Sequence, residues 1–276
     1  MNAVRDGAFA RVTAVRLGFT SMATIALAAL VGLVAFGWPL VADPQSEAVA
    51  HSHDAPFLFA VVVPLLLLVV LAQVSDGGMD AKAVAMLGVL AAVIAALRPL
   101  GGGTAGIEPI WVVLVLGGRA LGPGFGFSLG AVSMLASALT TGGVGPWLPF
   151  QMIGAAWVGM GAGLLPRASG RREITMLAGY GAAACVAYGF CLNLWFWPFT
   201  SGLPDGIAFV PGDPLLANLI AWLRFSLVTS LGYDIPRAAL TVALILVAGR
   251  PVLLALRRMS RKAAFEAAVT FERSAA

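Results

Sequence analysis

Long apolar blocks, separated by short polar or glycine-rich connections, most limit what this chain can fold into. The blocks are Leu17–Val41, Phe57–Val74, Ala83–Leu97, Ile107–Gly118, Pro123–Thr140, Leu148–Leu165, Ile174–Pro198 and Leu215–Ala248. Most approach the roughly 20 residues that a helix needs to cross a bilayer. Only 11% of the residues are charged, less than half of the roughly 25% found in soluble domains. The sequence therefore predicts an all-α integral membrane protein with about eight transmembrane helices.

The distribution of basic residues predicts the orientation of these helices. With a cytoplasmic N-terminus and eight crossings, most Lys and Arg residues face the cytoplasm. The connections 42–56, 141–147 and 199–214 contain neither Lys nor Arg. Cytoplasmic loops of membrane proteins carry such an excess. We therefore expect a multi-pass protein of the cytoplasmic membrane with both termini inside the cell, and the net charge of +4 does not indicate a nucleic-acid partner.

Two blocks have unusual lengths. Ile107–Gly118 is short for a crossing and is followed by glycines, so it predicts either a short helix or half of a broken one. Without this block the cluster Arg167–Arg172 and the basic C-terminus would face opposite sides, so we keep it. Leu215–Ala248 would reach about 50 Å as one helix and must tilt, bend at Pro236 or leave the membrane. The last residues, 251–276, predict an amphipathic cytoplasmic helix or a solvated tail.

Small residues recur at helical spacing in three places. Gly122, Gly126 and Gly130 form one stripe, and Gly159 and Gly163 form another. Such stripes let helices approach closely in a membrane, and we expect these two to pack within the chain. The third stripe contains Gly88, Ala91, Ala92, Ala95 and Ala96. This smooth face suits either internal packing or the docking of a partner helix.

Aromatic and amide side chains meet at the outer ends of two blocks. Trp147 and Gln151 follow the glycines of the 141–147 connection, and Asn193 and Trp195 end the seventh block. Tryptophan at that depth also suits an interfacial belt, as does Trp197. Aromatic rings beside amides are typical of a pocket for an amphiphilic ring ligand. We therefore predict that Trp147, Gln151, Asn193 and Trp195 contact a ligand.

A few ionisable residues lie within or beside the apolar blocks, where charge is expensive. Asp234 and Arg237 are three residues apart on one helical face, which predicts a structural ion pair. Arg98 and Glu108 flank the glycine-rich connection 101–106, and they could pair across it or contact a ligand.

Motifs for bound cofactors, metals and catalysis are absent from the sequence. His51, His53 and Asp54 fit an ordinary polar loop better than a metal site. Cys185 and Cys191 have neither redox nor metal-clip spacing, so we expect small core residues. We expect no cofactor, no metal and no enzymatic activity.

The run Phe125–Met134, followed by GGVGPWLPFQM over residues 142–152, resembles the substrate-specific S components of energy-coupling factor (ECF) transporters, in particular the cobalamin-associated branch. The resemblance covers residues 80–250. It implies a six-span core over 81–250, after a two-span extension over 1–80. It also implies a ligand site under the loops 99–108, 141–147 and 199–214, and docking of the first core helix on a transmembrane coupling protein through Gly88, Ala91, Ala92 and Ala95.

The leading hypothesis is therefore an S component. It captures a vitamin, a cobalamin or related corrinoid, from outside and passes it to a module of one coupling protein and two ATPases. The residues expected to contact it are Arg98, Glu108, Trp147, Gln151, Asn193 and Trp195. Two alternatives are a membrane enzyme of lipid or isoprenoid metabolism and a stand-alone permease. Clustered carboxylates would favour the enzyme, and internal repeats the permease.

Overall fold

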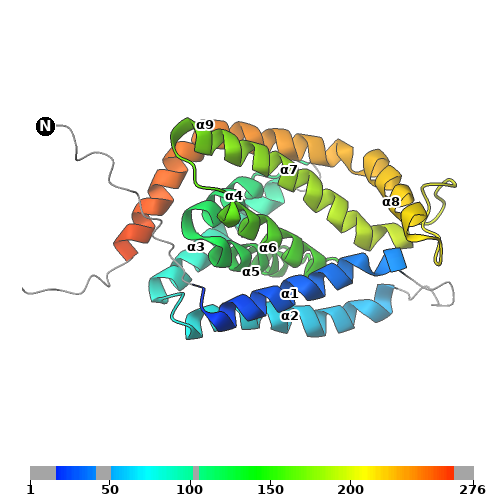
Figure 1. Cartoon of the computed structure of the whole chain (residues 1–276), viewed down its shortest axis with the longest axis horizontal. Helices are drawn as coiled ribbons and strands as arrows, with labels where there is room; N and C mark the ends of the chain where they lie inside the picture. The colour runs from blue at the N-terminus through cyan, green and yellow to red at the C-terminus, as the bar shows by residue number, and fades with distance from the viewer. Residues whose placement is uncertain (1–16, 42–50, 102–105, 264–276) are drawn as a thin grey trace, which may run out of the picture.

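The computed structural model describes residues 17–41, 51–101 and 106–263, and within them the chain forms helices and turns only (Figure 1). The helices are α1 Phe19–Gly37, α2 His51–Ser75, α3 Ala81–Leu97, α4 Ile110–Leu121, α5 Pro123–Thr141, α6 Leu148–Leu164, α7 Gly170–Phe196, α8 Leu215–Thr229 and α9 Leu231–Ala263. Short 3-10 turns follow three of them, at Trp38–Val41, Arg98–Gly101 and Trp197–Phe199. The basic N-terminal residues, the centre of the glycine-rich connection and most of the C-terminal tail lie outside the described residues.

Five helical stretches of the described chain are long and apolar enough to cross a membrane. They are Phe19–Leu40, Ala81–Gly101, Pro123–Thr141, Gly170–Phe199 and Leu231–Ser260. Shorter apolar helices accompany them at Val61–Ser75, Ile110–Leu121, Leu148–Leu164 and Leu215–Thr229. Large apolar side chains face outward, as at Val247, which is 82% exposed. The chain is a multi-pass membrane protein, and its eight crossings stay a prediction because several of these helices are short.

Helices α5 and α6 pack closely because glycines face each other. A Cβ at Gly126 would overlap the carbonyl of Gly159, and a Cβ at Gly159 would overlap that of Gly126. Further along the same interface, Gly130 lies against the backbone of Ala155. Close backbone approach replaces the hydrophobic driving force that lipid does not supply. The prediction that the glycine stripes pack within the chain is confirmed.

Helix α4 is a short helix buried inside the bundle. Almost all of its residues are buried, and it packs on α5, α6, α7 and α9. Gly122 joins it directly to α5 with a φ of 103°, a value that glycine tolerates and other residues rarely adopt. Of the two alternatives for this block, the structure therefore gives a short helix, extended to Leu121.

The last block forms two helices with a break at Ser230 and none at Pro236. A tilt, a bend at Pro236 and an exit from the membrane were the expected alternatives. The backbone N–H groups of Tyr233 and Asp234 both donate to the carbonyl of Ser230, which begins α9 there. Pro236 lies inside α9, where its missing N–H removes only a bond of the first turns. Helix α9 then continues to Ala263, so the tail expected from residue 251 begins as part of this helix.

The expected loop at His51–Asp54 also differs, because α2 already begins at His51. Polar residues such as Ser and Asp are tolerated at a helix start. The apolar pattern, which begins at Phe57, therefore placed the start of this helix too late.

The first two helices pack directly on the rest of the bundle. The ring of Phe36 in α1 lies 5.0 Å from Phe150 and 5.6 Å from Trp157, both in α6. In α2, the buried Gln73 side chain donates to Ser128 of α5 at 2.9 Å. The separation of residues 1–80 as an extension stays a prediction, and a buried hydrogen bond crosses that division.

The predicted docking face of α3 is divided between two environments. Ala91 and Ala95 are buried in the core at 2% and 6% exposure, whereas Gly88 and Ala92 are exposed. Ala91 and Ala95 lie on the edge of the helix that faces the core, and docking through these four residues stays a prediction. Ala96 joins Gly88 and Ala92 on the exposed face.

Candidate functional site

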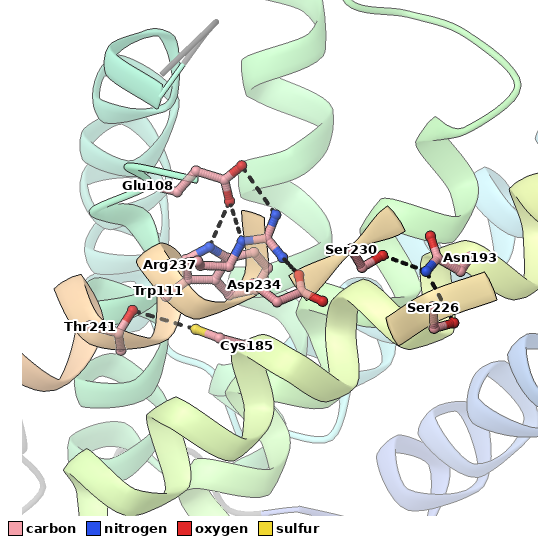
Figure 2. A network of polar contacts seen from close by, with 9 residues as sticks. All are labelled: Glu108, Trp111, Cys185, Asn193, Ser226, Ser230, Asp234, Arg237 and Thr241. Atoms are coloured by element: carbon pink, nitrogen blue, oxygen red, sulfur yellow. Dashed lines mark hydrogen bonds and ion pairs between the residues drawn. The ribbon is translucent and has the colours of Figure 1, made fainter. Parts of the chain in front are cut away.

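A cluster of charged side chains lies where the start of α9 meets α4 and α7 (Figure 2). Arg237 donates from Nη1 to Asp234 Oδ1 at 2.7 Å and from Nε to Glu108 Oε2 at 3.0 Å. Trp111, one turn after Glu108, donates from Nε1 to the same Glu108 oxygen at 2.8 Å. Two carboxylates therefore share one guanidinium, and the three ionised groups together carry one excess negative charge.

Aromatic rings enclose the guanidinium of Arg237. Its Cζ lies 5.6 Å from the ring centroids of both Trp111 and Tyr188, within the range of cation–π attraction. Arg237 and Asp234 are both buried, and buried charges persist only when they are paired and hydrogen-bonded. The pairing fixes the start of α9 against α4 and α7.

A cavity of about 330 Å³ adjoins this cluster between α7, α8 and α9. Its polar lining includes Asn193, Thr229, Ser230, Asp234 and Arg237. Its apolar lining includes Leu192, Phe196, Leu203, Phe225 and Tyr233. A few polar groups among apolar and aromatic walls are typical of a small-molecule site.

Asp234 presents one oxygen that is not satisfied. Its side chain is 1% exposed, and Oδ2 has no hydrogen-bond partner among the described residues. Gly189 of α7 makes room for this carboxylate, because a Cβ there would overlap both of its oxygens. An unpaired buried carboxylate oxygen is costly, which marks Asp234 as a ligand-contact candidate.

Asn193, one helical turn after Gly189 in α7, also lines the cavity with its amide held in place. The Nδ2 group donates to Ser226 Oγ at 3.1 Å and also to Ser230 Oγ (Figure 2). These bonds join α7 to the end of α8 at the break that precedes α9. Asn193 is the ligand-contact prediction that lines the cavity.

The other predicted contacts lie outside the cavity lining. Arg98 donates from Nη2 to Gln151 Oε1 at 2.5 Å, and Trp195 packs on Phe150 with ring centroids 5.5 Å apart. Trp147 is 40% exposed and donates to the carbonyl of Gly143. The pairing of Arg98 with Glu108 was wrong, because the structure gives each a different partner.

Several residues around the cavity were not found from the sequence. Trp111 had a local signal, since it lies three residues after Glu108. Tyr188, Phe225, Ser226 and Ser230 had none, because their roles depend on how α7, α8 and α9 pack.

An aromatic cluster holds the loop that follows α7. Trp197 is fully buried and donates from Nε1 to the carbonyl of Ile207 at 2.7 Å. The Phe209 ring lies 5.1 Å from that of Trp197 and 6.4 Å from that of Trp38. Trp197 is therefore not part of an interfacial belt, and it anchors a loop whose residue Leu203 lines the cavity.

A second ionic network lies where α4 ends, α7 begins and α9 passes. Glu173 accepts from Arg119 Nε and from Arg257 Nη2, both at 2.6 Å. Arg119 also donates to the carbonyl of Leu165 at 2.9 Å. This network ties three helices together away from the cavity, which indicates a structural role.

Comparison with known proteins identifies the family. The model of the ECF transporter substrate-specific component matches residues 82–256, more than half of the 276 residues. No curated protein and no solved structure matches the chain. The match makes the membrane-enzyme alternative wrong and implies an ECF module and a small substrate as partners. The chain belongs to the substrate-specific components of ECF transporters, which bind a substrate for transport and are not enzymes.

Proposed function

We propose that this chain captures a vitamin at the outer face of the cytoplasmic membrane and delivers it to an ATP-driven coupling module. The observation that carries the proposal is the cavity between α7, α8 and α9, which lies in the family-matched region and beside an anchored loop. Both termini lie in the cytoplasm in this proposal, because the 199–214 loop contains no Lys or Arg.

The proposed partners are one transmembrane coupling protein and two ATPases. The chain has no GxxxxGK[ST] phosphate-binding loop, so another subunit must hydrolyse ATP. The proposed docking surface is the exposed small-residue face of α3, formed by Gly88, Ala92 and Ala96. Small side chains allow a partner helix to approach closely within the membrane.

The size of the cavity bears on which vitamin is bound. At about 330 Å³ it lies at the low end of the roughly 300–1,000 Å³ of ligand pockets. A corrinoid with its nucleotide loop is larger than this cavity. We therefore favour a vitamin smaller than a corrinoid, and the assignment to a cobalamin branch stays a prediction from the motif at 142–152.

Co-purification tests the docking part of the proposal. The tagged chain is co-expressed with the coupling protein and ATPases of its own organism, and the recovered subunits are quantified. Gly88→Trp is expected to reduce their recovery at least tenfold, because the indole would separate the helices. Val247→Trp places the same ring on an exposed position of α9 and should leave recovery unchanged. Failure of the unsubstituted chain to recover the module would contradict the proposal.

A stand-alone permease is distinguished by transport itself. Uptake by vesicles containing this chain alone, without ATP, would favour the permease, whereas the proposal requires the module.

A further inference from the structure

We propose that the cavity beside Asp234 binds a compact organic cation, such as an ammonium, an amidinium or a positively charged heteroaromatic ring. This inference rests on the proposed function and names the chemical class of its substrate.

Arg237 is shared between two carboxylates. It donates to Asp234 through Nη1 and to Glu108 through Nε and Nη2. Its positive charge is therefore engaged by two negative charges. Glu108 and Arg98 both lie outside the cavity lining, where Arg98 is hydrogen-bonded to Gln151. A cation bound in the cavity would supply Asp234 with a second positive partner, in a region where charge is expensive unless it is paired.

One oxygen of Asp234 is unpaired. Asp234 lines the cavity, is 1% exposed and has no partner at Oδ2. A carboxylate oxygen only accepts hydrogen bonds. The ligand group that satisfies it must therefore donate a hydrogen bond or carry positive charge.

The rest of the lining adds aromatic faces. The Nδ2 group of Asn193 is already bonded to Ser226 and Ser230 and leaves the Asn193 amide oxygen as an acceptor. Phe196, Phe225 and Tyr233 line the same cavity, and aromatic faces attract cations. The unpaired oxygen of Asp234 and the π-faces thus favour the same class of ligand.

Binding to the purified chain by isothermal titration tests the inference. The cationic probes are thiamine, pyridoxamine and choline, and the anionic probes of similar size are biotin and pantothenate. At least one cation is expected to bind at least tenfold more tightly than either anion. Tighter binding of an anion, or no binding by any of the three cations, would overturn the inference.

Two substitutions locate the effect. In Asp234→Asn the amide oxygen can still accept from Arg237, while an NH₂ group replaces the unpaired oxygen, so affinity for the cation should fall at least tenfold. Asn193→Asp adds a second carboxylate to the cavity lining and should raise that affinity severalfold. Asp213→Asn removes an exposed acid outside the cavity and should change nothing. Unchanged affinity in both cavity variants would overturn the inference.

The outcome is separable from that of the proposed function. A chain that recovers the coupling module but binds anions refutes the cation inference alone. A chain that does not recover the module refutes the proposed function, whatever it binds.

Discussion

Replacing Glu173 is expected to cost more than replacing Arg257, although the two side chains bond each other. The side chains of Arg119 and Glu173 are 2% and 4% exposed, whereas that of Arg257 is 37% exposed. Glu173→Gln leaves a buried guanidinium without its carboxylate partner, which costs about 3–5 kcal/mol. Arg257→Gln leaves the pair of Arg119 and Glu173 in place and removes a partly solvated partner, which costs roughly 1 kcal/mol or less.

Thermal unfolding in detergent, followed by intrinsic fluorescence, measures this difference. At roughly 2–4 °C per kcal/mol for a chain of this size, Glu173→Gln should lower the melting temperature by about 10 °C and Arg257→Gln by only a few degrees. The double change Arg119→Met with Glu173→Leu should recover most of the loss, because an apolar replacement leaves no buried charge. Equal losses for the two single variants, or no recovery in the double variant, would refute the reasoning.

Three further predictions concern packing, pH and the loop after α7. Gly159→Ala places a Cβ into the backbone of α5 and should lower the unfolding free energy by about 1–3 kcal/mol. Gly179 has open space around it, so Gly179→Ala should leave the unfolding free energy unchanged. Equal melting temperatures of the two variants would contradict this. Hydrogen bonds from the side chain and backbone of Ser21 lower the pKa of Asp76 in the folded chain. The contribution of Asp76 to stability is therefore present above the pKa of the unfolded chain, near 4, and is lost as the pH falls through the folded pKa. Asp76→Asn should therefore melt with a weaker dependence on pH in acid, and parallel acid profiles of the two proteins would count against it. Trp38→Ala removes a ring that packs on the loop 199–209, and hydrogen exchange should speed up there without speeding up in α5.

The sequence was sufficient to predict a membrane protein and most of its helices, because an apolar block long enough to cross a bilayer usually forms a transmembrane helix. It was also sufficient for the contact of Asp234 with Arg237, since residues three apart in a helix share a face. The spacing of the glycines predicted that both stripes pack within the chain, and the structure shows that they face each other.

Longer-range contacts could not be predicted in the same way. Glu108 and Arg237 are 129 residues apart, and no periodic pattern relates them. Arg119 fitted the expected cytoplasmic bias, so nothing local indicated that it is buried against Glu173. The burial of Ala91 and Ala95 in α3 could not be predicted, because small residues on adjacent edges give no signal of which edge meets the core.

The cavity depends on the helix break at Ser230, which no sequence pattern predicted. Its walls come from α7, α8 and α9, and the helix break at Ser230 brings Asn193 beside Ser226 and Ser230. One unbroken helix over residues 215–248 would not have this break, and the contacts of Asn193 with Ser226 and Ser230 depend on it. Of the six predicted ligand contacts, Asn193 therefore lines the cavity and the other five do not.

Reconstituted uptake tests the central claim most directly. The chain is placed in liposomes alone and together with its coupling protein and ATPases, and entry of a radiolabelled vitamin that the purified chain binds is measured with and without internal ATP. The account predicts uptake only with the complete module and ATP, and binding without uptake by the chain alone. Equal, ATP-independent uptake by the chain alone would contradict it.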